Sequence, residues 1–339
     1  MTSTPGNLTS NSPWPHRLAV LLCCTTFPLI WVGGLVTTYR AGMAVPDWPN
    51  TYGYNLFLYP WQTWILGPWD LFIEHGHRLL GATVGMIAIA LLVALWRSEE
   101  RRWVRWLGVV ALAAVIFQGM LGGLRVLFDA QQIAKIHGCF GPLFFALTVA
   151  LATITSRRWL AAPTESKAGS GKLQRLALLT TLFAYVQLVL GAQIRHQPVT
   201  ATPGSFRIAL YFHLAMAAVV VVHAWLLASR VLRNHRSERW LVAPAVSIAL
   251  LVLLQVLLGF GVWLIKFGAP SWLGGYNWAA GHTVAAEGFL QAHITTLHVA
   301  TGSLIIAAAL LVAVRSLRLY RGAPAVLVAA PLMLEGAAS

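Results

Sequence analysis

Long apolar runs alternate with short polar connections along most of the chain. Eight runs reach about 20 residues, the length that an α-helix needs to cross the hydrocarbon core of a bilayer. They lie near Leu18–Thr38, Ile73–Trp96, Arg105–Leu127, Ile136–Thr155, Leu173–Ile194, Ile208–Ser229, Leu241–Ile265 and Ala292–Val314. The pattern predicts an all-α membrane protein with eight transmembrane helices.

The distribution of charge along the chain predicts how the helices are oriented across the membrane. The chain is 58% hydrophobic and 10% charged, and its net charge is +14. The Lys and Arg residues cluster after every second run, whereas the intervening connections hold few, mainly Arg40, Lys135, Arg207 and Lys266. The positive-inside rule therefore places both termini in the cytoplasm. This distribution indicates a lipid bilayer as the partner and argues against nucleic acid.

Two halves are separated by the linker-like stretch Glu165–Lys172. Gln-x-x-Leu-Gly occurs in the third, fifth and seventh runs, and Gly33-Gly34 stands at the matching height of the first. Four runs per half keep the same orientation, so we predict two parallel-repeated four-helix bundles. The expected boundaries are a disordered cytoplasmic tail (1–17), the first bundle (18–160), a linker (161–173), the second bundle (174–320) and a cytoplasmic tail (321–339).

Four histidines occupy one position on the even-numbered runs, within about two helical turns of the outer start. A small residue follows each one four positions later, on the same helix face. An imidazole with a bare patch one turn deeper suits an iron porphyrin. We interpret the four as axial ligands of two haem irons, one pair per half; for any single histidine, a hydrogen-bonded packing role is the alternative. They are His77, His137, His213 and His298.

Glu74 and Arg78 stand beside the first of these histidines, where ionisable groups are costly and often functional. Arg78 is a candidate for binding a haem propionate, as are Arg125 and Arg195. A structural Glu74–Arg78 ion pair, four residues apart on one face, is the alternative. The Trp- and Tyr-rich outer loop, roughly 39–72, is either an interfacial aromatic belt or a lid over an outer site.

Several motifs in this order resemble the haem A synthase family. They are Glu74-x-x-His77-Arg78, Pro46-Asp47-Trp48-Pro49, the Gln-x-x-Leu-Gly repeats and Leu-Gly-Ala-x-x-Arg195-His196. The resemblance covers nearly the whole chain. It implies an oxidoreductase of the bacterial cytoplasmic (inner) membrane that oxidises the C8 methyl of haem O to a formyl group, by successive hydroxylations, for cytochrome oxidase assembly.

The resemblance also implies roles for individual residues. His77 and His137 would flank the iron of the substrate haem O, His213 and His298 would hold a permanent haem b, and Glu74 would be the catalytic carboxylate. Haem O synthase and cytochrome oxidase assembly factors are candidate partners, the electron acceptor is unknown, and a homo-oligomer is compatible with the sequence.

The sequence departs from the family pattern at two places, and one alternative function also fits the four histidines. The three cysteines, Cys23, Cys24 and Cys139, lie outside the first outer loop, where many family members carry a cysteine pair. Leu214 and Val299 follow the later histidines where an Arg follows the first. A non-enzymatic dihaem cytochrome b, passing electrons to or from quinone, explains the four histidines equally well but gives Glu74 no role.

Overall fold

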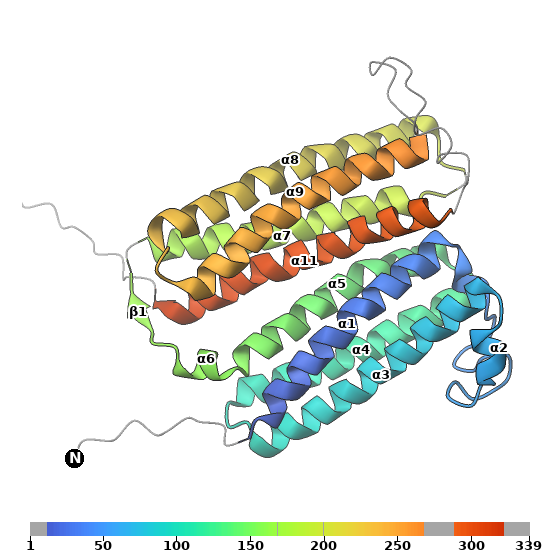
Figure 1. Ribbon diagram of the computed structural model, residues 1–339, viewed down its shortest axis with the longest axis horizontal. Coiled ribbons are helices and arrows are strands. Elements are labelled where there is room, and N and C mark those ends of the chain that lie inside the picture. Colours follow the sequence, from blue (N-terminus) through green and yellow to red (C-terminus); the bar gives the residue numbers. More distant parts are fainter. Residues whose placement is uncertain (1–11, 168, 199, 268–287, 322–339) are drawn as a thin grey trace, which may run out of the picture.

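The structure, a computed structural model, describes residues 12–167, 169–198, 200–267 and 288–321, which are almost entirely helical (Figure 1). Within them, eight helices are long and apolar enough to cross a membrane. These are α1 (Trp14–Thr38), α3 (Trp69–Ser98), α4 (Arg102–Leu127), α5 (Gln131–Ile154), α7 (Ser170–Arg195), α8 (Pro203–Asn234), α9 (Arg239–Phe267) and α11 (Phe289–Leu319). The predicted class is confirmed: the chain is a multi-pass, all-α membrane protein.

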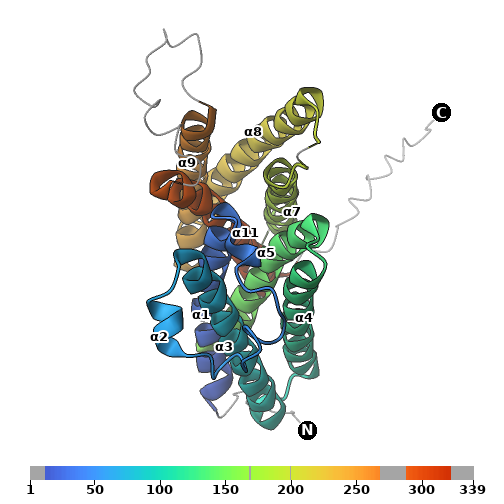
Figure 2. The same cartoon turned by 90° about the vertical axis from the view of Figure 1, so that its right-hand side faces the viewer.

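The helices pack as two four-helix bundles, as Figures 1 and 2 show. In the first, α1 and α4 each pack on α3 and α5; in the second, α7 and α9 each pack on α8 and α11. α3 and α5 are therefore diagonal neighbours, as are α8 and α11. The bundles meet where α11 contacts α1 and α5, and α5 contacts α7. The order of neighbours is the same in both halves, while the predicted parallel symmetry between them stays a prediction.

Several helices extend beyond the apolar runs that predicted them. α1 begins at Trp14, after Pro13 at the cap position, and Pro15 suits its first turn. Residues 14–17 are therefore helical, and that part of the disordered-tail prediction was wrong. α8 begins five residues before its apolar run, where the Thr202 side chain accepts a hydrogen bond from the Ser205 amide. Such polar or aromatic end turns carry no hydropathy signal.

Short elements complete the connections. The segment between α1 and α3 contains the 3₁₀ helix η1 (Ala41–Met43) and α2 (Trp61–Ile65), and it folds over one end of the first bundle. α6 (Arg157–Ala161) ends at the first residue of the predicted linker, which contains β1 (Glu165–Ser166) and the first residues of α7. β1 pairs in parallel with β2 (Tyr320–Arg321), so the linker is tied to the end of α11.

Each bundle has its own apolar core, at the end away from the four histidines. Leu22, Leu91 and Leu151 are fully buried in the first bundle, and Leu227 and Leu241 in the second. Removing such side chains from solvent or lipid contact stabilises close packing through many small dispersion contacts. At the opposite end of the first bundle, a smaller apolar cluster that includes Leu35 and Ile73 lies beside buried polar groups such as Glu74 and His75.

Candidate functional site: two histidine pairs

The four predicted histidines meet as two facing pairs, one in each bundle. The ring centroids of His77 and His137 lie 6.4 Å apart, and those of His213 and His298 also lie 6.4 Å apart. A metal ion bound by one nitrogen of each ring, at about 2 Å, would separate the centroids by roughly 6 Å. Because each pair comes from diagonal helices, it spans the interior of its bundle.

The composition of each pair favours haem over a protein-only metal site. Among the described residues, no group of three His, Cys, Asp or Glu side chains lies close enough to hold a metal. Zinc sites in proteins take three or four protein ligands. Haem iron takes its remaining ligands from the porphyrin, and needs only one or two axial side chains. Two facing imidazoles therefore fit a haem.

A glycine from a neighbouring helix lies against each imidazole. These helices are α1, α4, α7 and α9. A Cβ atom added to the glycine would stand 2.8–3.4 Å from the ring Cε1, closer than most such contacts allow. The glycines of Gln-x-x-Leu-Gly, read from the sequence as helix-packing positions, thus bring backbone against the histidines. The contacts join Gly33 to His77, Gly122 to His137, Gly191 to His213 and Gly259 to His298.

The carbonyl four residues before each glycine faces the same ring. His137 Nδ1 donates to the Gln118 carbonyl at 3.1 Å. A carbonyl on Nδ1 fixes the imidazole tautomer and leaves Nε2 for a metal. In the other three cases the carbonyl interacts with the ring, but Nδ1 has no partner at full hydrogen-bond geometry. These carbonyls belong to Leu29, Gln187 and Gln255, beside His77, His213 and His298.

The glutamine side chains distinguish the halves. The Gln187 amide nitrogen lies 3.1 Å from His213 Nε2, and that of Gln255 lies 3.4 Å from His298 Nε2. The Gln118 amide instead donates to the His137 carbonyl at 3.2 Å. A metal that bound Nε2 of both histidines in the second bundle would therefore displace two amides.

The small residues one turn deeper than the histidines are not equivalent. A Cβ atom on Gly81, below His77, would meet nothing within 4 Å. At Gly141 it would lie 3.3 Å from the Gln118 amide nitrogen, and at Gly302 3.6 Å from that of Gln255. The bare patch predicted from the sequence is thus open at Gly81, and is bordered by glutamine amides at the other two glycines.

Glu74 and Arg78 form a buried ion pair of 3.0 Å at the outer end of α3, with side chains 3% and 11% exposed. The second Glu74 oxygen accepts from the Val45 amide at 2.9 Å. Arg78 also donates to the carbonyls of Val45 and Asp47, each at 2.7 Å, and Asn50, at 2.9 Å. The structural alternative for this pair is therefore present, and the propionate contact of Arg78 stays a prediction.

Arg125 and Arg195 also contact backbone. Arg125 donates to the Gly42 carbonyl at 2.7 Å, and Arg195 donates to the Gly34 carbonyl at 2.8 Å. The Arg195 contact crosses from the second bundle to the first, because Gly34 belongs to α1. Both arginines stay candidates for binding an anionic group near the outer ends.

Two contacts of the outer loop were missed by sequence reasoning. The Trp48 indole packs directly on the backbone at Gly123. Thr51 Oγ1 lies 3.0 Å from Nδ1 of the buried His75. The doublet Gly122-Gly123 could have indicated the Trp48 contact. Packing against His137 requires only Gly122, so a second close contact is needed to explain Gly123. A second aromatic loop, which carries Trp272, Tyr276 and Trp278 before α11, lies outside the described residues.

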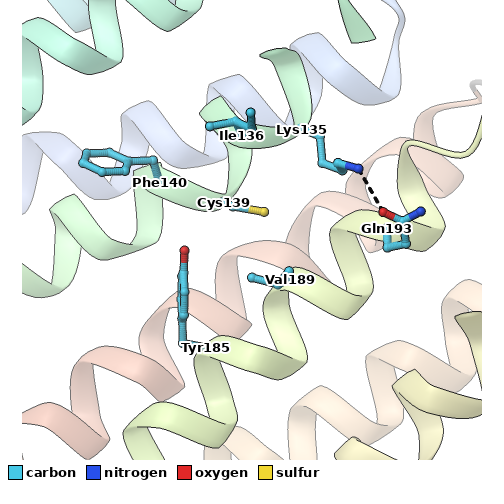
Figure 3. A pocket seen from close by; sticks show the side chains of 7 residues that line it. All are labelled: Lys135, Ile136, Cys139, Phe140, Tyr185, Val189 and Gln193. Carbon is cyan, nitrogen blue, oxygen red and sulfur yellow. Dashed lines mark hydrogen bonds between the residues drawn. The ribbon is translucent and has the colours of Figure 1, made fainter. Parts of the chain in front are cut away.

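A cavity of about 320 Å³ lies between the bundles, where α5 faces α7 (Figure 3). The Lys135 ammonium donates to Gln193 Oε1 at 2.9 Å at one end, while Cys139 and Tyr185 line the middle. None of the four paired histidines lines it. The cavity is thus distinct from both histidine pairs.

Comparison with known proteins bears on the residues of the first pair. The family of cytochrome oxidase assembly proteins named COX15-CtaA matches residues 69–206. The heme A synthase of Shouchella clausii is 29% identical over 197 residues, covering 56% of this chain and 62% of that protein. The heme A synthases of Alkalihalophilus pseudofirmus (24% over 269 residues; 73% and 87% covered) and Halalkalibacterium halodurans (23% over 247 residues; 68% and 80% covered) are also similar.

The chain is similar to haem A synthases, whose matches cover 56% to 73% of its length. The resemblance read from its motifs is confirmed. The segment that matches the family model contains both histidines of the first pair together with Glu74 and Arg78, and ends before His213. The match covers α3, α4, α5 and α7, and leaves out α1, the remaining helix of the first bundle.

Proposed function

We propose that the protein oxidises the C8 methyl of haem O to a formyl group, yielding haem A, by successive hydroxylations. One observation carries the proposal: the first histidine pair lies beside a buried carboxylate and guanidinium, whereas Leu210 and Leu214 occupy the corresponding positions beside His213. The match to the cytochrome oxidase assembly family and the similarity to heme A synthases support it.

In this proposal the two pairs hold different haems. His213 and His298 would hold a resident haem b, and His77 and His137 would flank the iron of the substrate haem O. Iron with two imidazole ligands favours electron transfer over oxygen binding, so the resident haem b would supply electron transfer. The open space at Gly81 leaves room for a flat ligand beside His77.

Glu74 is the group proposed to accept a proton from the substrate methyl or from water. Each carboxylate oxygen accepts one hydrogen bond in the structure, from Arg78 or from Val45. A carboxylate has about four acceptor positions, so acceptor capacity is left for a third group. The two hydrogen bonds fix the position of the carboxylate and leave acceptor positions free, as a proton acceptor requires.

The cellular setting is part of the same proposal. Basic residues cluster in alternate connections, which supports a bacterial inner-membrane protein with both termini in the cytoplasm. The histidine pairs would then lie near the outer surface. Haem O synthase is the proposed supplier of substrate, and the oxidation requires an external electron acceptor.

Pigment extraction tests the proposal. The protein is expressed with a haem O synthase, and its haems are separated by chromatography. Haem A or a hydroxylated intermediate is expected in the wild type, and neither is expected in Glu74→Gln. Haem b at full occupancy in both bundles, with no oxidised product, would support the dihaem cytochrome b instead. That rival is favoured by the identical 6.4 Å spacing of the two pairs.

A further inference from the structure

A stretch of the first loop, which we name the outer segment (42–51), bridges α3 and α4 at the outer end of the first bundle. Arg125 of α4 donates to the carbonyl at its start, Gly42. Glu74 and Arg78 of α3 bind its middle. Thr51, at its end, contacts His75 of α3. The outer segment thus lies across the end of the bundle that contains His77 and His137.

Trp48 is the side chain that this attachment positions. Arg78 donates to the carbonyls of Asp47 and Asn50, on either side of it. The Asp47 carboxylate accepts from the amides of Tyr52 and Gly53, both at 2.8 Å, and fixes the following turn. The backbone on both sides of Trp48 is therefore held by hydrogen bonds.

The indole of Trp48 rests on α4 one residue from the first histidine site. Any Cβ atom at Gly123 would overlap its ring, so only glycine permits this contact. The preceding Gly122 is the residue that packs against His137. Trp48 nevertheless remains 38% exposed, although backbone hydrogen bonds surround it. An indole fixed in place with part of its surface free is suited to contact a planar aromatic ligand.

We propose that Trp48 is a ligand-binding residue of the first histidine site, and contacts the planar macrocycle that His77 and His137 hold. The inference rests on the proposed function of that site and adds a residue that binds its ligand. In the second bundle, Leu210 and Leu214 cannot bind a loop as Glu74 and Arg78 do. Among the described residues, the attachment that positions Trp48 therefore has no counterpart at these two positions.

Binding of haem O and haem b to the first site provides the main test. The purified protein, with its resident haem b, is titrated with each haem and followed by difference absorbance. Trp48→Ala is expected to bind haem O and haem b each about tenfold more weakly, because both present the same planar macrocycle, with Trp48→Phe intermediate. The matched control is Trp61→Ala, because Trp61 lies on α2 of the same loop and is 61% exposed. Unchanged affinity for both haems in Trp48→Ala would overturn the proposal.

A glycine pair on α4 tests whether the position of the indole matters. Gly123→Ala displaces the ring, whereas Gly119→Ala, one turn earlier, meets nothing within 4 Å. Gly123→Ala is expected to weaken haem O binding as much as Trp48→Ala, to add nothing in the Trp48→Ala background, and to keep the spectrum of the resident haem b. Additive losses would contradict the proposal.

These binding measurements separate this inference from the proposed reaction. A wild-type protein that binds haem O more tightly than Trp48→Ala does, but forms no oxidised product, would refute the reaction and leave the role of Trp48 standing. Conversion with unchanged kcat and an unchanged KM for haem O in Trp48→Ala would refute the role of Trp48 and leave the reaction standing.

Discussion

The two bundles place a histidine pair in the same way and surround it differently. In both, a glycine of a neighbouring helix lies against each imidazole, and the paired rings are 6.4 Å apart. Among the described residues, only the first pair has a buried carboxylate–guanidinium ion pair beside it, and this ion pair binds the outer segment. We infer that the histidine–glycine arrangement, which both bundles share, serves to hold a macrocycle. The carboxylate and guanidinium, which the first bundle adds, serve to modify it.

Removing one histidine from each bundle is the largest test of this division. His298→Ala is expected to abolish the low-spin haem b spectrum, because one of the two axial ligands is lost. His137→Ala is expected to keep that spectrum and to lose conversion by at least about 100-fold. Visible spectroscopy and pigment extraction measure the two effects. Loss of haem b in His137→Ala would show that the bundles do not hold separate haems.

Replacing Glu74 tests the asymmetry itself. Glu74→Ala is expected to reduce conversion by about 10²- to 10⁴-fold, the range for losing a positioned proton acceptor, while the haem b spectrum stays. The matched control is Leu210→Ala, at the same position relative to His213, which is expected to leave conversion within about twofold. If Glu74→Ala removed haem b, the carboxylate would have a structural role.

Arg78 tests whether the outer segment depends on the buried ion pair. Arg78→Ala leaves a buried carboxylate without its partner, and is expected to destabilise the fold by about 3–5 kcal/mol. The control is Arg158→Ala, which breaks the Arg158–Glu238 pair; those side chains are 56% and 31% exposed, so a cost below about 1 kcal/mol is expected. Thermal unfolding in detergent measures both. Equal shifts in the two variants would show that the burial of the Glu74 pair does not matter.

The histidine pairs could be predicted because their signals are local. Hydropathy locates the helices, and the distance of each histidine from a helix start gives its depth. The sequence does not show which neighbour meets which ring. Gly122 and Gly123 are adjacent and identical, yet one contacts His137 and the other contacts Trp48 from a distant loop.

The partners of Arg78 could not be predicted for a similar reason. A guanidinium beside a proposed haem site suggested a propionate, but the structure gives both of its terminal nitrogens protein oxygens. Three of these are backbone carbonyls of an irregular loop, where no periodicity indicates which groups point inward. The Glu74–Arg78 contact itself was foreseen, because residues four apart on a helix share a face.

The glycines beside the rings provide a smaller test of the shared scaffold. Gly33→Ala would place a Cβ atom 2.8 Å from His77 Cε1, so the ring must shift, whereas a Cβ atom at Gly85, deeper in α3, meets nothing within 4 Å. Overpacking of this kind costs about 1–3 kcal/mol, and we expect haem O binding to weaken about tenfold in Gly33→Ala and to stay unchanged in Gly85→Ala. Titration of both variants measures this difference. An equal loss in Gly85→Ala would mean that contact with the His77 ring does not cause the loss.

The smallest expected effect is a pH dependence at the outer segment. Partial burial opposes ionisation of Asp47, but the amides of Gly53 and Tyr52 and the charge of Arg78 hold its pKa below the usual value. A carboxyl with a lowered folded-state pKa stabilises the fold fully above its unfolded value, near pH 4, and loses that contribution as the pH falls through the folded value. The rate at which pepsin cleaves the outer segment, divided by the rate for Asp47→Asn at the same pH, should therefore rise only below about pH 4. Asp47→Asn is the reference because its amide does not titrate, so the division removes the pH dependence of pepsin itself. If this ratio rose already above about pH 5, a group other than Asp47 would control the attachment, and the clamp on Trp48 would depend on a different contact.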